Sequence, residues 1–124
     1  MEIKCGTDII EVERIKNSIE TLGDNFLNKI YTKKEIEYCN SKNNMKYQHF
    51  AGRFAAKEAF FKAVSTFLNN KFDISWQDMQ VINDENGKPI VEILNVSLPQ
   101  IESIDISISH LKDYAIANCT LICK

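Results

Sequence analysis

The sequence predicts an α+β fold, in which a small antiparallel sheet packs with helices, one of them a long central helix, in a single domain over residues 1–124. Three observations predict it. The first half of the chain carries helical periodicities, and a stretch after Lys46 is apolar or small on nearly every helical face. The second half carries short β-branched runs next to turn residues. The 124 residues are 44% hydrophobic, which is enough for one core.

The chain begins with a predicted half-buried strand. Apolar and polar residues alternate over 1–5, and the strand is expected to end at residues 6–8. This would place Asp8 at a strand-to-helix junction, where an aspartate either caps the helix or serves as a metal ligand held by rigid elements. Residues 12–22 repeat apolar side chains at helical spacing, and this helix is predicted to stop at Gly23.

Two shorter helices are predicted before the long one. Asp24 is a candidate cap for the first, and Thr32 with Glu35 matches the capping-box pattern that opens the second. A polar loop then leads into the long helix. This helix is expected to start near Lys46 and to lose its regularity at 69–70.

The long helix is predicted to bury an aromatic stripe. At 3.6 residues per turn one face collects Phe50, Phe54, Phe61, Val64 and Leu68. The back of the helix is alanine, which is not a solvent face. Its charged residues therefore need partners inside the protein, in a subunit interface or in a ligand, and these residues are Arg53, Lys57, Glu58 and Lys62. An internal salt-bridge network is the simplest of the three alternatives.

Two hairpins are predicted in the second half. Residues 79–82 and 90–94 bracket an Asn-Gly turn, and Asn-Gly between such runs is typical of a hairpin. Residues 104–109 and 114–122 flank a tight connection and form the second hairpin. These four strands are expected to supply most of the sheet.

Composition disfavours several classes of protein. No run approaches the roughly 18 to 20 apolar residues of a membrane span, and the first residues lack the pattern of a signal peptide, so we expect a cytoplasmic protein without a membrane segment. The four cysteines form no CxxC pair, so structural zinc is not expected and the thiols are interpreted as core residues.

The charge is distributed unevenly. Residues 29–62 hold eight basic and three acidic residues, although the whole chain has a net charge of -2. One part of the surface should therefore favour anions. The chain lacks the aromatic-basic pattern of nucleic-acid binders, so we expect no nucleic acid and favour a phosphorylated small molecule or an acidic protein.

Polar residues occur within apolar surroundings at three places, which are Asp8, the group Lys57, Glu58 and Lys62, and the group Ser107, Ser109 and His110. Aspartate and glutamate together suit Mg²⁺, which takes one or two carboxylates and fills its other positions with waters and substrate phosphates. Lys62, one turn after Glu58, could neutralise those phosphates. Such a set supports transfer of a phosphate-linked group. His110 lies beside a predicted turn, where a histidine serves either in catalysis or as a structural hydrogen-bonding residue.

Four motifs lie in order across most of the chain. They are Gly6-Thr7-Asp8-Ile9-Ile10 with Arg14-Ile15, Phe50-Ala51-Gly52-Arg53-Phe54-Ala55-Ala56-Lys57-Glu58-Ala59 with Lys62-Ala63, Asn86-Gly87-Lys88-Pro89, and Ser107-Ile108-Ser109-His110 with Tyr114-Ala115. Together they resemble the holo-[acyl-carrier-protein] synthase family of 4'-phosphopantetheinyl transferases. The second motif is highly specific, and the first and last would be weak alone.

The resemblance implies a fold, a reaction and an assembly. The reaction would transfer the 4'-phosphopantetheine group of coenzyme A to a serine of apo-acyl carrier protein, with Mg²⁺ required and adenosine 3',5'-bisphosphate released, in support of fatty acid biosynthesis. The fold would be that of the 4'-phosphopantetheinyl transferases. Family members of this size are homotrimers with a site at each subunit interface, which would explain a helix without a solvent face.

The resemblance also implies roles for single residues. Asp8 and Glu58 would bind the metal, and Lys62 would meet the coenzyme phosphates and the charge on the leaving group. Glu58 would take the serine proton directly or through a metal-bound water, and the sequence leaves both routes open. Arg14 would face the acidic carrier protein. The other coenzyme-binding residues would be Arg53, Lys57, Gly87, Lys88, Pro89, Ser109 and His110.

One segment departs from the family pattern. Residues 65–72 stand where the family usually has a glycine-containing loop near the coenzyme, so no coenzyme contacts are assigned there.

Two rival functions fit part of the sequence pattern. An anion-binding or carrier-binding module would use the basic segment but would have no use for Asp8 and Glu58 together. A phosphohydrolase with the same metal pair would release pantetheine phosphate to water without a protein acceptor.

Overall fold

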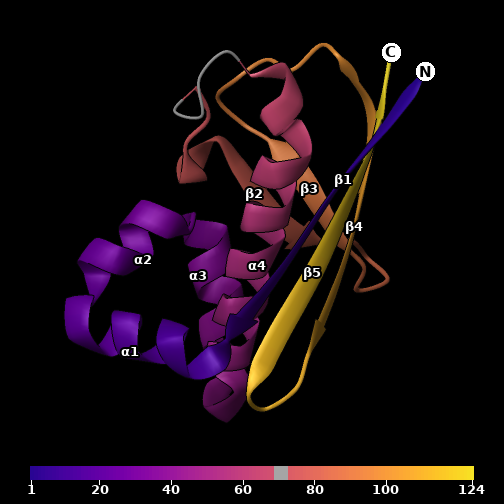
Figure 1. Cartoon of the computed structure of the whole chain (residues 1–124). Helices are drawn as coiled ribbons and strands as arrows, with labels where there is room; N and C mark the ends of the chain where they lie inside the picture. The colour runs from indigo at the N-terminus through magenta and orange to yellow at the C-terminus, as the bar shows by residue number, and fades with distance from the viewer. Residues whose placement is uncertain (69–72) are drawn as a thin grey trace.

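The computed structural model describes residues 1–68 and 73–124 and has an α+β architecture (Figure 1). Its strands and helices are, in chain order, β1 (Glu2–Glu11), α1 (Val12–Leu22), α2 (Asp24–Ile30), α3 (Lys33–Asn40), α4 (Lys46–Val64), β2 (Met79–Asn83), β3 (Pro89–Ile93), β4 (Ile101–His110) and β5 (Tyr114–Cys123). Short 3-10 turns occupy Asn43–Met45, Ser65–Phe67 and Trp76–Asp78. The long helix ends at Val64, earlier than the expected loss of regularity at 69–70, which lies outside the described residues.

The strands form two antiparallel sheets rather than one. β5 lies between β1 and β4 in the larger sheet, and the β2–β3 hairpin forms the smaller one. The long helix α4 runs alongside the larger sheet, and α1, α2 and α3 pack as a group around the N-terminal half of α4 (Figure 1). Two clusters of buried apolar side chains result, one between α4 and the sheet and the other between α4 and the three shorter helices.

The first strand is longer than predicted. β1 pairs with β5 over all ten of its residues, so Asp8 lies opposite Ala117 in the middle of the ladder and not at a strand-to-helix junction. The strand continues because its last residues pair with β5. Thr7 and Ile9 face outward, while Gly6 is buried on the inner face. The helix that an aspartate at the junction could have capped begins only at Val12.

The alanine face of α4 is buried throughout, whereas the predicted aromatic stripe is buried only in part, at Phe50 and Val64. Ala55, Ala56, Ala59 and Ala63 have almost no exposed surface, whereas Phe54 and Phe61 are only half-buried and pack against Trp76. The reason is the short distance between α4 and β1: a Cβ added at Gly6 would lie 1.9 Å from the carbonyl oxygen of Ala59. Only small residues permit this close approach of α4 to β1.

Several local predictions are confirmed. Thr32 and Glu35 form the reciprocal capping box, Gly23 ends α1, and both hairpins pair as expected. The Asp24 side chain does not cap α2, which has Gly23 at its cap position. Three cysteines are buried, but Cys5 is exposed, so the core interpretation is wrong for that thiol.

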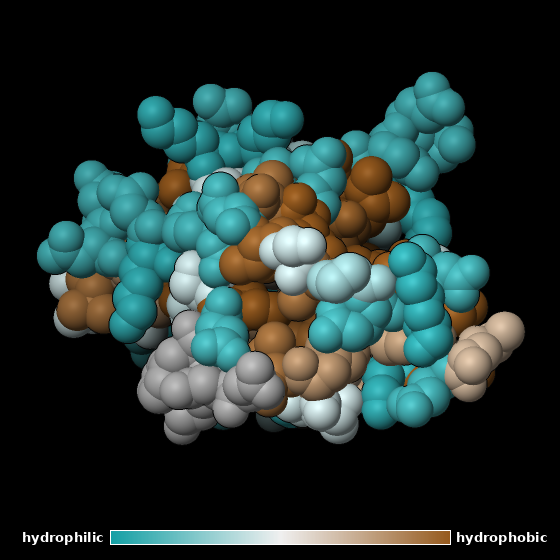
Figure 2. Space-filling view, turned by 90° about the horizontal axis from the view of Figure 1, so that it is seen from above, coloured by the Kyte–Doolittle hydropathy of each residue, from teal (hydrophilic) through white to brown (hydrophobic). Residues whose placement is uncertain are grey.

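Apolar side chains also reach the surface at the end of the molecule where α4 finishes. Figure 2 looks onto this end and shows a hydrophobic area with hydrophilic residues around it. Among the described residues, no helix is both long enough and apolar enough to cross a bilayer.

Candidate active site

The contact between β1 and α4 brings together three of the predicted site residues. The Lys62 ammonium lies 3.2 Å from the Asp8 carboxylate and 2.9 Å from the carbonyl oxygen of Thr7. Glu58 lies one turn before Lys62, and the pKa of its carboxyl group is raised, mainly by burial and then by the negative charge of Asp8. Two carboxylates from β1 and α4 therefore share one site with a half-exposed cation.

This donor set fits a hard divalent cation better than a transition metal. No cluster of three histidine, cysteine, aspartate or glutamate side chains suited to a metal is found in residues 1–68 and 73–124. A pair of carboxylates matches Mg²⁺, which usually takes one or two carboxylates and keeps waters and substrate phosphates as its other ligands. Asp8 and Glu58 could hold such an ion.

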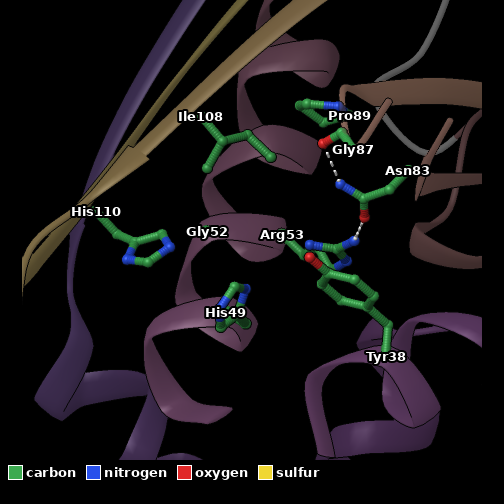
Figure 3. Close-up of a pocket in the computed structure, with 9 residues that line it drawn as sticks. All are labelled: Tyr38, His49, Gly52, Arg53, Asn83, Gly87, Pro89, Ile108 and His110. Carbon is green, nitrogen blue, oxygen red and sulfur yellow. Dashed lines mark hydrogen bonds between the residues drawn. The ribbon is translucent and has the colours of Figure 1, made fainter. Parts of the chain in front are cut away.

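A second site is a pocket of about 180 Å³ that α3, α4, β4 and the β2–β3 hairpin enclose. Figure 3 shows its side chains, among them Tyr38, His49, Arg53 and His110. Arg53 is only 4% exposed, its guanidinium lies 4.0 Å from the centre of the Tyr38 ring, and it donates a hydrogen bond to Asn83. Its buried Nε has no hydrogen-bond partner among the described residues. A buried cation with an unused donor is suited to receive an anion.

The β2–β3 turn forms one wall of this pocket. Gly87 has a φ of +82°, which favours glycine, and its carbonyl accepts a hydrogen bond from Asn83 (Figure 3). Gly87 and Pro89 line the pocket. Lys88 does not: its ammonium lies 2.7 Å from the Asp105 carboxylate, and this hydrogen bond lowers the Asp105 pKa.

His110 and Ser109 are separated by the alternation of β4. His110 faces the pocket, with Nδ1 2.9 Å from the Gln48 amide oxygen and its ring centre 4.9 Å from that of His49. Burial, and then the charges of His110 and Arg53, lower the pKa of His49 to about 4. Ser109 is exposed and lines a neighbouring hollow with Ile9 and His110, so the structure does not bring it to the pocket around Arg53.

Lys57 is not a residue of either site. It is 0% exposed, and its ammonium lies 2.8 Å from the Glu35 carboxylate. The same ammonium donates to the carbonyls of Ile30, Trp76 and Met79. These contacts leave it no capacity for a phosphate, because an ammonium has only three donors. The assignment of Lys57 to coenzyme binding is therefore replaced by the internal salt-bridge alternative, which the sequence left open.

Arg14 is exposed on α1, on the side opposite the buried Val12 and Ile15.

The sequence predictions missed four residues of the pocket region, which are Tyr38, Gln48, His49 and Asn83. The spacing of His49 and Arg53, four residues apart on one helix, was a usable signal for one of them. No sequence signal linked Tyr38 or Asn83 to Arg53, because their contacts depend on the packing of separate elements.

Comparison with known proteins identifies the group to which this architecture belongs. A model of the "4'-phosphopantetheinyl transferase superfamily" matches residues 4–119. A holo-[acyl-carrier-protein] synthase of Protochlamydia amoebophila is 46% identical over 119 residues, covering 94% of this chain and 95% of that protein.

Solved structures agree with this match. A holo-(acyl-carrier-protein) synthase from Bacillus anthracis, crystallised in complex with CoA (3',5'-ADP), superposes with a TM-score of 0.79 at 37% identity and covers 98% of this chain and 96% of its own. The synthase from Helicobacter pylori in complex with coenzyme A gives a TM-score of 0.80 at 27% identity, with 95% and 99% covered. The chain therefore belongs to the 4'-phosphopantetheinyl transferase superfamily, among the holo-[acyl-carrier-protein] synthases.

Proposed function

We propose that this protein transfers the 4'-phosphopantetheine group of coenzyme A to a serine of apo-acyl carrier protein and releases adenosine 3',5'-bisphosphate. The observation that carries the proposal is the meeting of Asp8, Glu58 and Lys62 where β1 crosses α4. The named relatives and the coenzyme complexes of similar structures support it. In a cell, the product would serve fatty acid biosynthesis.

Mg²⁺ is part of the proposal, with Asp8 and Glu58 as its protein ligands. When bound, the ion would neutralise the charge of the pyrophosphate oxygens and so favour displacement at the phosphorus. Lys62 supplies a second positive charge to the same group. Its side chain is half-exposed, so its ammonium can leave the Asp8 carboxylate and donate to a phosphate of the leaving group.

Glu58 is the proposed proton acceptor. The attacking serine hydroxyl must lose its proton, and Glu58 takes it directly or through a water. Without a metal, burial and the negative charge of Asp8 raise the pKa of Glu58, and a bound Mg²⁺ would oppose this shift. Before the coenzyme binds, Asp8 accepts a hydrogen bond from Lys62, which orients its carboxylate.

The pocket around Arg53 is the proposed site of the nucleotide end of coenzyme A. The positive charge of Arg53 would attract a phosphate there, and the Tyr38 ring and Asn83 hold the guanidinium in place. Gly87, Pro89 and His110 would complete the wall. Lys88 and Ser109 stay proposed coenzyme contacts only if the neighbouring subunit brings a coenzyme to the outer side of the sheet.

One experiment separates this transferase from the rival phosphohydrolase. The wild-type protein, coenzyme A and Mg²⁺ are incubated with and without apo-acyl carrier protein, and adenosine 3',5'-bisphosphate is quantified by chromatography. The transferase predicts release only when the carrier protein is present. Release without carrier protein would indicate hydrolysis, and no release in either tube would contradict both enzymatic functions.

We propose a homotrimer because one face of the larger sheet is uncovered. The outer side chains of β1 and β5 include large apolar residues, with Ile3 66%, Ile9 62%, Tyr114 51% and Ile116 42% exposed. Ile9 and Ile116 lie opposite each other in the ladder. A second copy of the chain would bury these side chains, whose exposure is otherwise unfavourable.

Replacement of Ile9 by glutamate is expected to dissociate the assembly. The introduced charge would be buried against apolar side chains without a partner, which disfavours association. Size-exclusion chromatography with light scattering should give a trimer mass for the wild type and a monomer mass for Ile9→Glu. Leu22→Glu on α1, at a residue that is 55% exposed, is the control and should leave the mass unchanged. A monomeric wild type at micromolar concentration would contradict the trimer.

Arg14→Glu is expected to weaken recognition of the acidic carrier protein selectively. Arg14 is an exposed cation on α1, and reversing its charge changes attraction into repulsion. Steady-state kinetics should show a rise in the KM for carrier protein, by about tenfold or more, with the KM for coenzyme A nearly unchanged. An equal rise of both KM values would argue against this role.

A further inference from the structure

The hydrogen bond between Gln48 and His110 joins the start of α4 to the end of β4. Gln48 Oε1 lies 2.9 Å from His110 Nδ1, and both residues are partly buried. An amide oxygen can only accept a hydrogen bond, so the His110 Nδ1 must carry a hydrogen. The contact therefore selects one tautomer of the neutral ring, with the hydrogen on Nδ1 and a lone pair on Nε2.

The remaining nitrogen of His110 is left for a ligand. Figure 3 shows the ring extending from β4 into the pocket, on the side of Gly52 and Arg53. Since Nδ1 is engaged by Gln48, Nε2 is the nitrogen that can contact a molecule in the pocket. The neutral ring would accept a hydrogen bond there, and the protonated ring would donate one, while Gln48 accepts from Nδ1 in both forms.

His49 supports the same ring from the other side. Its imidazole meets that of His110 edge to face, with ring centres 4.9 Å apart, and it also contacts the Tyr38 ring at 5.6 Å. Burial and neighbouring positive charges lower the pKa of His49 to about 4, so this ring is neutral at neutral pH. His49 thus acts as an apolar wall that limits rotation of His110 without adding a charge.

We infer that Gln48 is a positioning residue for coenzyme binding: it fixes the tautomer and orientation of His110 so that Nε2 faces the adenine-nucleotide portion of coenzyme A. This inference rests on the proposed function for the identity of the ligand. Neither Gln48 nor His49 needs to touch the coenzyme. The arrangement resembles a metal-bound histidine, whose second nitrogen is held by an outer hydrogen bond that sets the tautomer.

Substitution of Gln48 should change coenzyme binding but not the chemical step. Gln48→Leu removes the acceptor, and the KM for coenzyme A should rise about three- to tenfold, the value of one hydrogen bond. The kcat should stay within about twofold, and the KM for carrier protein should not change. Gln48→Glu keeps an acceptor of the same shape and should preserve the hydrogen on His110 Nδ1, while its added negative charge would itself weaken binding of the anionic coenzyme. Gln100→Leu, at an exposed glutamine in the turn before β4, is the matched control.

Two readouts distinguish positioning from a general effect on folding. The ¹⁵N resonances of the His110 ring, recorded without coenzyme, should show the Nδ1–H tautomer in the wild type and in Gln48→Glu, and its loss in Gln48→Leu. In a His110→Ala background, Gln48→Leu should cause no further rise in KM. An Nε2–H tautomer in the wild type, or an undiminished effect of Gln48→Leu without His110, would overturn the inference.

These outcomes separate this inference from the proposed function. If the wild type fails to release adenosine 3',5'-bisphosphate in the presence of carrier protein, the proposed function fails. The tautomer of His110 in the free protein is measured independently of that result, and it alone can overturn the role of Gln48.

Discussion

Replacing either Asp8 or Glu58 by alanine is expected to abolish transfer of phosphopantetheine to apo-carrier protein. Each substitution removes one of the two carboxylates that meet where β1 crosses α4, and with it a proposed ligand of Mg²⁺. Loss of one preorganised charged group at a reacting centre typically lowers kcat by a factor of about 10² to 10³. Glu58→Ala also removes the proposed base, so its loss should be at least as large.

The same two variants should fold normally. The Asp8–Lys62 ion pair is partly solvent-exposed, and such pairs contribute at most about 1 kcal/mol to the free energy of unfolding. Among the described contacts, Glu58 has no hydrogen-bond or ion-pair partner, so its removal leaves no group unsatisfied. The raised pKa of Glu58 also indicates that its surroundings disfavour the charged carboxylate. Urea unfolding should therefore give midpoints close to that of the wild type.

A carboxylate on the same strand provides the control. Glu2 is exposed at the start of β1, where it pairs with Lys4, and Glu2→Ala should leave the transfer rate unchanged. Removal of divalent cations with EDTA should stop the wild-type reaction, and added Mg²⁺ should restore it. Near-normal turnover by both Asp8→Ala and Glu58→Ala would refute the metal assignment.

Lys57→Met is expected to destabilise the protein by about 3 to 5 kcal/mol, the cost of breaking a buried ion pair. The substitution leaves the Glu35 carboxylate buried without its counter-charge and three backbone carbonyls without their shared donor. These contacts connect α4 to the end of α2, the first turn of α3, the 3-10 turn at Trp76–Asp78 and the start of β2. Urea unfolding should show the loss as a lower midpoint.

Two further variants identify the cause. Lys62→Met removes a half-exposed lysine of the same helix and should change the free energy of unfolding by less than about 1 kcal/mol. The double variant Lys57→Met/Glu35→Gln should recover part of the lost stability, because it removes the uncompensated charge. If Lys57 instead bound coenzyme phosphates, Lys57→Met would raise the KM for coenzyme A and leave the unfolding midpoint unchanged.

Local signals in the sequence were sufficient for most of the secondary structure. The capping box of Thr32 and Glu35, the stop at Gly23 and the turn at Gly87 each depend on residues within a few positions of one another. The length of β1, by contrast, does not depend on neighbouring residues alone. Its last residues, Ile9 to Glu11, are held by pairing with 114–116 at the other end of the chain, which the alternation of residues 1–5 could not reveal.

The roles of the charged residues on α4 likewise depend partly on local sequence and partly on tertiary packing. The spacing of Glu58 and Lys62 placed both on one flank of the helix, and the structure brings Asp8 to them. Lys57 lies next to Glu58 in sequence but its side chain is buried, and its partners come from α2, α3, the 3-10 turn at Trp76–Asp78 and β2. The helical spacing predicts the face of α4 on which each charged residue lies. Tertiary packing determines which of these residues has a partner inside the protein.

The mass of an apo-acyl carrier protein, measured after incubation with this protein, coenzyme A and Mg²⁺, tests the central claim most directly. The proposed function predicts that the carrier protein gains the mass of one phosphopantetheine group, attached at a single serine. The gain should be absent when that serine is replaced by alanine and when Glu58→Ala is used as the enzyme. A carrier protein that keeps its original mass with the folded wild-type protein would contradict the proposed function.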